Sequence, residues 1–176
     1  PCQGLADLLT IIEHKGAVKG LKVAYVGDAN NVANSLAFGG ALLGAHVVIG
    51  SPEGYQLRVD VAKHASELAA ANGGSVVQVL DPRNAAEGAD VIYTDAWTSM
   101  GQEAEATQRA KIFPPYQVNT ELVSLAHKDV IVMHCLPAHR GQEITDEVAD
   151  GPHSVLWDQA ENRMHAQKAV LVQLLA

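Results

Sequence analysis

LKVAYVGDANN, residues 21–31, changes from an apolar run to a polar run between Val26 and Gly27. The run Leu21–Val26 is nearly continuous in apolar and β-branched residues, which is typical of a strand covered on both faces. The polar Gly27-Asp28-Ala29-Asn30-Asn31 follows it, and an Ala- and Leu-rich segment comes next. A buried strand that leads directly into a helix is the first half of a β-α-β unit, so these residues predict an α/β fold.

The same alternation continues along the chain. We expect strands at Leu21–Val26, His46–Ile49, Ser75–Leu80, Asp90–Thr94 and Val130–His134. We expect helices at Asn31–Leu43, Leu57–Ala71 and Thr120–Ala126, with Asn119 as the cap of the last, a turn at Arg83–Glu87 and a long loop from Asp95 to Pro115. Right-handed crossovers then give a Rossmann-like parallel sheet of five strands in the order 3-2-1-4-5, with helices on both faces.

The two ends of the chain carry helices of a different kind. Leu5, Leu8, Leu9 and Ile12 form a helical stripe that stops near Gly16, whereas Ala169–Ala176 is apolar nearly all round. A helix without a polar face needs burial on every side. Both helices lie either against the sheet of this domain or in an interface with a part that is not in these residues.

Composition limits the classes of partner. The 176 residues carry a net charge of -8 and are 48% apolar, which suits one globular domain. An acidic chain without a Lys/Arg run has no electrostatic footprint for nucleic acid or for an anionic membrane surface. Two cysteines far apart and no signal-peptide pattern indicate a reducing, cytoplasmic setting. The chain begins at Pro1 without an initiator Met, so we expect it to be part of a longer protein.

Reactive residues gather where the first, fourth and fifth strands end, which is where open α/β sheets bind ligands. They are Asn30 and Asn31, then Asp95 with the segment to Gly101, then His134-Cys135-Leu136-Pro137. One asparagine is suited to cap the following helix while its neighbour meets a polar ligand. A strand-end carboxylate such as Asp95 either forms a turn or meets a cation, for example an amine.

Cys135 has three interpretations: a small core residue, a nucleophile, or a neutral hydrogen-bonding group. We expect no metal site, because adjacent His and Cys on extended backbone point in opposite directions and no ligand spacing accompanies them. A dinucleotide site is disfavoured because GDANN replaces Gly-x-Gly-x-x-Gly after the first strand.

The segments Asp95-Ala96-Trp97-Thr98-Ser99-Met100-Gly101, His134-Cys135-Leu136-Pro137 and Pro1-Cys2-Gln3 together resemble ornithine carbamoyltransferase. The resemblance is to the carboxyl-terminal, ornithine-binding half of that family and extends over essentially all of residues 1–176. Aspartate carbamoyltransferases carry a segment similar to His-Pro-Leu-Pro where this chain has His134-Cys135-Leu136-Pro137, so ornithine is favoured over aspartate as the acceptor.

The resemblance implies specific roles at matching positions. Ornithine would be bound by Asn31, Asp95, Ser99 and Met100, with Asp95 at its α-amino group. Carbamoyl phosphate would be contacted by Gln3, Cys135, Leu136 and Arg163, and Asp95 and Cys135 would be the catalytic pair. No cofactor and no metal are implied.

The resemblance also implies what lies outside these residues. The family places most of its phosphate-binding cations in an amino-terminal carbamoyl-phosphate domain, so we expect the 176 residues alone to be inactive. The terminal helices, about 2–15 and 159–176, would pack on that missing domain, and the full-length enzyme would be a homo-oligomer, typically a trimer. The competing interpretation is a non-catalytic Rossmann-type module that binds a nucleotide or an amino acid.

Overall fold

A computed structural model describes residues 1–98 and 103–176. It contains a five-stranded parallel sheet in the order β3-β2-β1-β4-β5. The strands are β1 (Lys22–Val26), β2 (His46–Gly50), β3 (Ser75–Val79), β4 (Val91–Thr94) and β5 (Ile131–His134). The expected α/β class and strand order are confirmed, and each strand boundary lies within one residue of its expected position.

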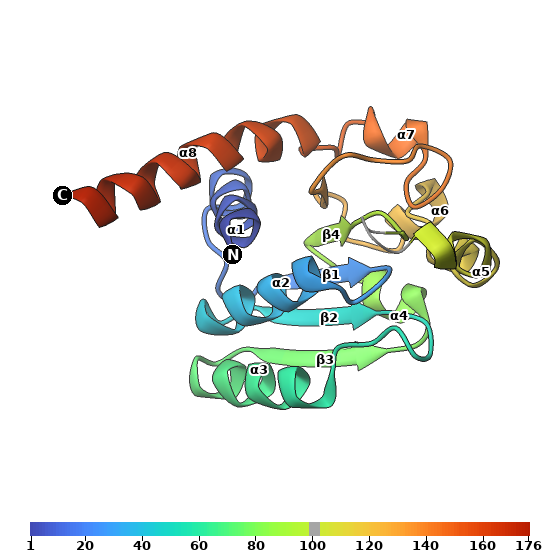
Figure 1. The fold of residues 1–176 in the computed structure, drawn as a ribbon, viewed down its shortest axis with the longest axis horizontal. Coiled ribbons are helices and arrows are strands. Elements are labelled where there is room, and N and C mark those ends of the chain that lie inside the picture. The colour runs from blue at the N-terminus through green and yellow to red at the C-terminus, as the bar shows by residue number, and fades with distance from the viewer. Residues whose placement is uncertain (99–102) are drawn as a thin grey trace.

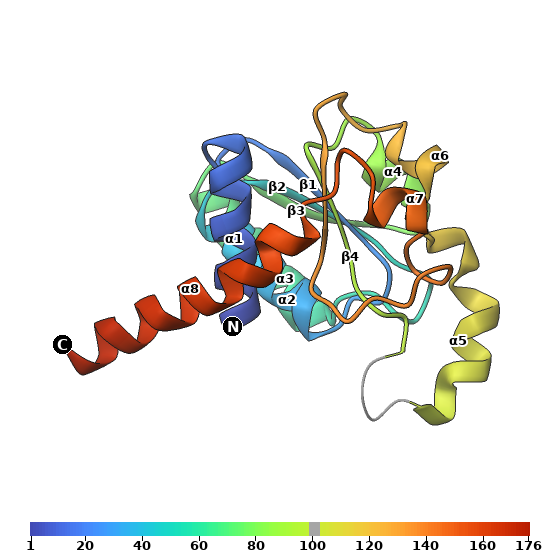
Figure 2. The same cartoon turned by 90° about the horizontal axis from the view of Figure 1, so that it is seen from above.

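Helices cover both faces of the sheet (Figures 1 and 2). One face carries α1 (Cys2–Lys15), α2 (Asn31–Leu42) and α3 (Val59–Ala71), with α8 (Leu156–Leu175) across α1. The other carries α4 (Pro82–Ala86), α6 (Thr120–Val123) and α7 (Asp146–Ala149), with α5 (Ala106–Ile112) at its edge. Two short 3-10 turns, Glu103–Glu105 and Pro114–Tyr116, flank α5.

Strand side chains alternate between two cores. Val23 and Tyr25 of β1 pack with α2 and α3, whereas Ala24 and Val26 pack with α4 and α6. All four are buried. Because both faces are covered, the strands show continuous apolar runs in the sequence instead of an alternation of apolar and polar residues.

The prediction of one long loop from Asp95 to Pro115 is wrong. Among the described residues of this segment, Ala106–Ile112 form the helix α5, which was not expected. The apolar pattern there is short, and its central buried side chain is the charged Arg109. A helix that buries an arginine instead of a leucine gives no hydrophobic periodicity to detect.

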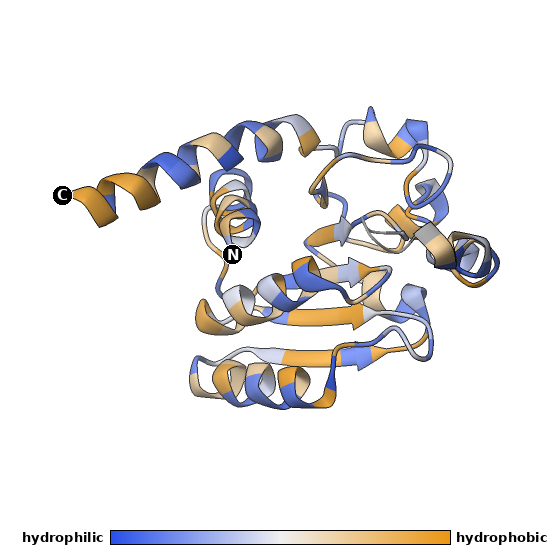
Figure 3. Cartoon of the chain, in the orientation of Figure 1, coloured by the Kyte–Doolittle hydropathy of each residue, from blue (hydrophilic) through white to orange (hydrophobic). Residues whose placement is uncertain are grey.

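The two terminal helices differ in how much of their length is buried. α1 ends at Gly16, whose φ of 80° is the left-handed geometry that glycine adopts readily. The first part of α8 buries Gln159, Asn162 and Ala166, but Leu174 and Leu175 are 76% and 83% exposed. Figure 3 shows this apolar end of α8 projecting from the rest of the chain. No helix among the described residues is both long and apolar enough to cross a membrane.

Candidate functional site

Asn30 and Asp95 connect the ends of β1 and β4. The Asn30 Oδ1 atom accepts a hydrogen bond from the Val32 amide at 2.9 Å, which caps α2. Its Nδ2 atom donates to Asp95 Oδ2 at 2.6 Å. The Ala96 amide donates to the other Asp95 oxygen at 2.8 Å. One asparagine therefore both begins the helix and fixes the orientation of the carboxylate.

Cys135 lies against the same carboxylate. Its Sγ atom donates to Asp95 Oδ1 at 2.9 Å. Burial raises the pKa of the Cys135 thiol well above its usual range, and the charge of Asp95 and the hydrogen bond to it raise the pKa further. A thiol with a raised pKa is neutral at physiological pH and therefore a poor nucleophile. The geometry favours the interpretation of Cys135 as a neutral hydrogen-bonding group.

The backbone after Cys135 is held in an unusual conformation. Leu136 has a φ of 56°, which a non-glycine residue adopts only when its surroundings enforce it. Its amide donates to Nδ1 of His134 at 2.8 Å, and Nε2 of His134 lies 3.0 Å from Oε1 of Glu143. Since an amide can only donate, Nδ1 is the acceptor and Nε2 donates to the carboxylate. Glu143 also accepts from the His139 amide at 2.6 Å, so it braces both sides of the bend.

Asp95, His134 and Cys135 each place one potential metal-ligand atom within 4.8 Å of the others. Both ring nitrogens of His134 are already bonded within the protein, and the Cys135 thiol is a donor to Asp95. An ion would have to break the bend at Leu136 to use the imidazole. The trio does not fit a metal ion.

A second group joins the first and last helices. Arg163 of α8 donates to Gln3 Oε1 at 2.7 Å, and Gln3 Nε2 donates to Asp7 Oδ1 at 2.7 Å. Asp7 also accepts from Gln159 at 2.7 Å and from the Tyr93 hydroxyl at 3.2 Å. Tyr93 belongs to β4, the strand that ends directly before Asp95. The two groups of polar residues are thus connected through the sheet.

Arg109 fixes the start of the segment that follows Asp95. Its guanidinium donates to Asp28 at 2.6 Å and to the Trp97 carbonyl at 2.8 Å, and it lies 2.9 Å from the Glu105 carboxylate. Burial raises the pKa of the Asp28 carboxyl, while the hydrogen bond and the charge of Arg109 oppose that rise. The residues on both sides of positions 99–102 are therefore anchored to the end of β1.

The expected site residues that the structure describes fall into three sets. Asp95, Cys135 and Leu136 lie together at the carboxyl edge of the sheet, and Gln3 and Arg163 are bonded to each other. Asn31 is exposed at the first position of α2, next to Asn30. Ser99 and Met100 lie outside the described residues.

Sequence reasoning missed the residues that hold the expected ones in place. Three of these are fully buried polar side chains: Asp7, Gln159 and Glu143. They lie in segments whose sequence predicts only a helix that packs on its neighbours, or a loop. The apolar stripe of the first helix did not reveal Asp7, because α1 buries the opposite face, with Asp7, Thr10 and Ile11, whereas Leu5 and Ile12 are 46% and 42% exposed. The sequence carries no local signal for Glu143 either.

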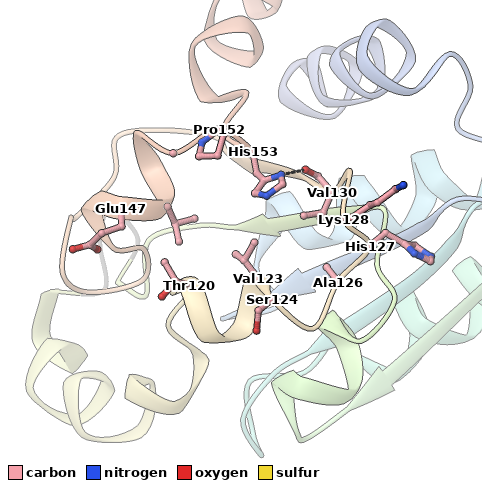
Figure 4. A pocket seen from close by; sticks show the side chains of 12 residues that line it. Thr120, Val123, Ser124, Ala126, His127, Lys128, Val130, Glu147, Pro152 and His153 are labelled. Atoms are coloured by element: carbon pink, nitrogen blue, oxygen red, sulfur yellow. Dashed lines mark hydrogen bonds between the residues drawn. The ribbon is translucent and has the colours of Figure 1, made fainter.

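Two hollows differ in their position relative to these residues. A broad hollow of about 680 Å³ lies beside Asn30, the residue that bonds to Asp95, and Asp28 and Arg109 also line it. A cavity of about 350 Å³ lies between α6 and α7 on the side of the sheet where β5 begins (Figure 4). It is mostly apolar and contains His153, which bonds to the Val130 carbonyl. None of the expected site residues that the structure describes lines this second cavity.

Comparisons with known proteins agree with the geometry. Residues 19–174 match the family model "Aspartate/ornithine carbamoyltransferase, Asp/Orn binding domain". The chain is 61% identical over 175 residues to the ornithine carbamoyltransferase of Pyrococcus abyssi and 60% identical to the anabolic ornithine carbamoyltransferase of Pyrococcus furiosus. Each alignment covers 99% of this chain but 55% and 56% of the relative, so the chain spans about half the length of the curated relatives it matches.

A solved structure gives the same result. The ornithine carbamoyltransferase of Pyrococcus furiosus superposes with a TM-score of 0.93 at 61% sequence identity, over 97% of this chain and 55% of that one. The fold, the residues gathered at the carboxyl edge and the family match point to the same conclusion: the chain belongs to the aspartate/ornithine carbamoyltransferase family, as its Asp/Orn-binding domain.

Proposed function

We propose that this chain is the ornithine-binding half of an ornithine carbamoyltransferase. That enzyme converts carbamoyl phosphate and L-ornithine to L-citrulline and phosphate, and the similarity to the anabolic enzyme of Pyrococcus furiosus favours a biosynthetic role. The observation that carries the proposal is the Asp95 carboxylate, which Asn30 and the Ala96 amide hold at the ligand-binding edge of the sheet. Because it has no cationic side-chain partner among its described hydrogen bonds, it suits an α-ammonium group.

The proposed chemistry divides among the residues as follows. Asp95 binds the α-amino group of ornithine, and Asn31, Ser99 and Met100 hold its polar end. The δ-amine, with an unperturbed pKa of about 10.4 like that of lysine, must lose a proton before it attacks the carbamoyl carbon. The neutral Cys135 thiol and the Leu136 backbone lie beside the carbamoyl group, and Gln3 and Arg163 contact carbamoyl phosphate. No cofactor is needed for this displacement.

The first test is ornithine binding. We expect calorimetry to show that Asp95→Asn weakens binding about tenfold or more, because a charge-assisted hydrogen bond contributes about 1.5–3 kcal/mol. Asp90→Asn is the matched control, since Asp90 precedes the same strand at its opposite end and bonds only to backbone among its described contacts. Equal ornithine affinity in Asp95→Asn and the unmodified chain would refute the role given to Asp95.

The second test is citrulline formation. The proposal places most of the phosphate-binding cations on the half of the enzyme that these residues do not span. Charge growing on the phosphate needs fixed donors, and here Gln3 and Arg163 supply few. We expect the 176-residue chain to form negligible citrulline and to gain activity when a carbamoyl-phosphate domain is supplied. Turnover by the 176 residues alone, near that of a full-length relative, would contradict this division.

The apolar end of α8 is the proposed contact with that domain. Leu171, Val172, Leu174 and Leu175 are all more than half exposed. Exposed apolar patches of this kind mark interaction sites. We expect the chain to self-associate through α8 in light scattering and to become monomeric in a Leu171→Glu/Leu174→Glu variant. A monodisperse unmodified chain at high concentration would argue against this contact. The complete enzyme is proposed to be a homo-oligomer, typically a trimer.

A further inference from the structure

A buried carboxylate lies behind the proposed carbamoyl-phosphate contacts. Asp7 is fully buried between α1, α8 and β4. Its Oδ1 atom accepts from Gln3 and from Gln159, each at 2.7 Å, and its Oδ2 atom accepts from Tyr93. Gln159 also donates to the Tyr93 hydroxyl at 3.0 Å and accepts from the His134 amide at 2.9 Å. All these bonds lie in one layer between the helices and the sheet.

The ionised form of Asp7 determines which way the Gln3 amide points. A carboxylate can only accept hydrogen bonds, so Gln3 must turn its NH₂ group toward Asp7. The Gln3 oxygen then faces outward, where the Arg163 guanidinium donates to it at 2.7 Å. Arg163 is exposed, whereas Asp7 is not. The buried charge thus fixes the orientation of two groups at the surface.

Resting on the function proposed above, we infer that Asp7 is a positioning residue of the carbamoyl-phosphate subsite. Its carboxylate holds the Gln3 amide in the orientation that also engages Arg163, so both side chains are presented to the same ligand. Through Tyr93 it is also connected to β4 and the Asp95 side of the site. Asp7 itself does not touch the reacting atoms.

Among the titratable groups that face one another here, Asp7 is the one that changes charge near neutral pH. They are Arg163 from α8, Tyr93 from β4, Cys135 after β5 and Tyr25 from β1. Burial raises the pKa of both tyrosines and of the thiol, so all three stay neutral, and the guanidinium stays cationic.

The Asp7 carboxyl itself titrates in a pH range that experiments can cover. Burial raises its pKa to about 6, against the hydrogen bonds from Gln3, Gln159 and Tyr93, which lower it. Below that pH a proton occupies a carboxylate oxygen, and the electrostatic hold on the Gln3 amide weakens. We therefore expect the Gln3 side chain and the Arg163 guanidinium to follow the protonation of Asp7.

The experiment is a pH titration of the isotope-labelled chain by NMR. The Asp7 carboxyl carbon, the Gln3 side-chain NH₂ and the Arg163 side-chain N–H signals are followed between about pH 4 and 8. We expect all three to share one midpoint, within about a unit of 6. Asp7→Asn should remove the transition from Gln3 and Arg163. The titration of the unmodified chain is informative even if that variant does not fold. Gln3 and Arg163 signals that ignore the protonation of Asp7 would overturn the inference.

Thr10→Val is the control for a purely structural role. Thr10 is buried one helical turn after Asp7 in the same α1–α8 contact, where it accepts from Asn162 at 3.0 Å, but it does not contact Gln3 or Arg163. It should retain the shared transition. Loss of the transition in Thr10→Val as well would mean that helix packing alone orients Gln3.

A ligand experiment separates this inference from the proposed function. Phosphonoacetamide, a stable analogue of carbamoyl phosphate, is titrated at pH 7.5 into the labelled chain with the carbamoyl-phosphate domain supplied, and the Gln3 and Arg163 signals are the reporters. We expect Asp7→Asn to require about fivefold more analogue, which corresponds to one hydrogen bond, and Thr10→Val to match the unmodified chain. Equal affinity in all three would overturn the positioning role. No response in the unmodified chain would reject the carbamoyl-phosphate assignment, while the pH titration would still test Asp7.

Discussion

Two buried carboxylates near the site are stabilised in different ways. Asp7, on α1, accepts only from uncharged groups among its described hydrogen bonds: two glutamine amides and a tyrosine hydroxyl. Asp28, at the end of β1, pairs with the guanidinium of Arg109 at 2.6 Å. Both are nearly inaccessible to water.

The difference shows how burial is tolerated. A buried carboxylate with neutral partners can relieve its desolvation by taking up a proton, and the pKa of Asp7 rises to about 6. For Asp28, burial also raises the pKa, but the nearby Arg109 cation opposes that rise. The Asp7 region is therefore sensitive to pH, whereas the Asp28 region is sensitive to loss of its partner.

The largest expected effect comes from removing the cation. We expect Arg109→Met to lower the free energy of unfolding at pH 7 by about 3–5 kcal/mol, because it leaves Asp28 buried and unpaired. Urea denaturation measures the change. Adding Asp28→Asn to that variant should recover much of the loss, because the unpaired charge is then gone. A loss below about 1 kcal/mol in Arg109→Met would mean that water already solvates Asp28.

The next effect is the pH dependence that Asp7 contributes. Its pKa is 3.8 when unperturbed and about 6 in the folded chain, so between these values the folded state binds the extra proton. Stability from this group is thus present below about pH 4 and is lost as pH rises to about 6 and above. We expect the unfolding free energy of the unmodified chain, relative to Asp7→Asn, to fall by about 2 kcal/mol between pH 4 and 7.

Urea titrations of both proteins at pH 4, 5 and 7 give this difference directly, and other titrating groups cancel in the comparison. A difference that stays constant, or that rises with pH, would show that folding does not raise the pKa of Asp7.

The smallest expected effect is at an exposed ion pair. Arg83 and Glu121 lie 2.7 Å apart, but their side chains are 56% and 73% exposed. We expect Glu121→Gln to change the unfolding free energy by less than about 0.5 kcal/mol, because water and salt screen such pairs. A loss above about 1 kcal/mol would show that burial is not what distinguishes Arg109 and Asp28 from other ion pairs in the chain.

The fold was predictable because its main signal is local. Each strand is a short apolar run, and Asn30 and Asn119 cap the helices that follow them, as their side-chain bonds show. Right-handed crossovers then leave few possible strand orders, and the order 3-2-1-4-5 is confirmed. The helix α5 was missed because the residue that it buries is charged.

The site was predictable in part for a related reason. Asp95 and Cys135 were recognised at strand ends, where an open sheet presents ligand-binding residues. Asp7 and Gln159 were not, because they bond to each other across 152 positions of the chain. Glu143 was not, because its partners, His134 and the His139 amide, meet it only through the bend that follows β5. A single sequence shows which residues are reactive, but it does not show which buried polar residues find each other across the fold.

The bond between Gln3 and Arg163 has a consequence for biosynthesis of the chain. It joins residues 160 positions apart, and the Asp7–Gln159 bond joins residues 152 apart. Chains emerge from the ribosome from the amino terminus onward, and domains generally fold as units. All five strands precede α8 in the chain, so the β-α-β core can assemble before α8 is made. Until then, the Asp7 carboxylate of α1 stays in contact with water. The polar layer behind the site can close only when the last helix of this domain has been made.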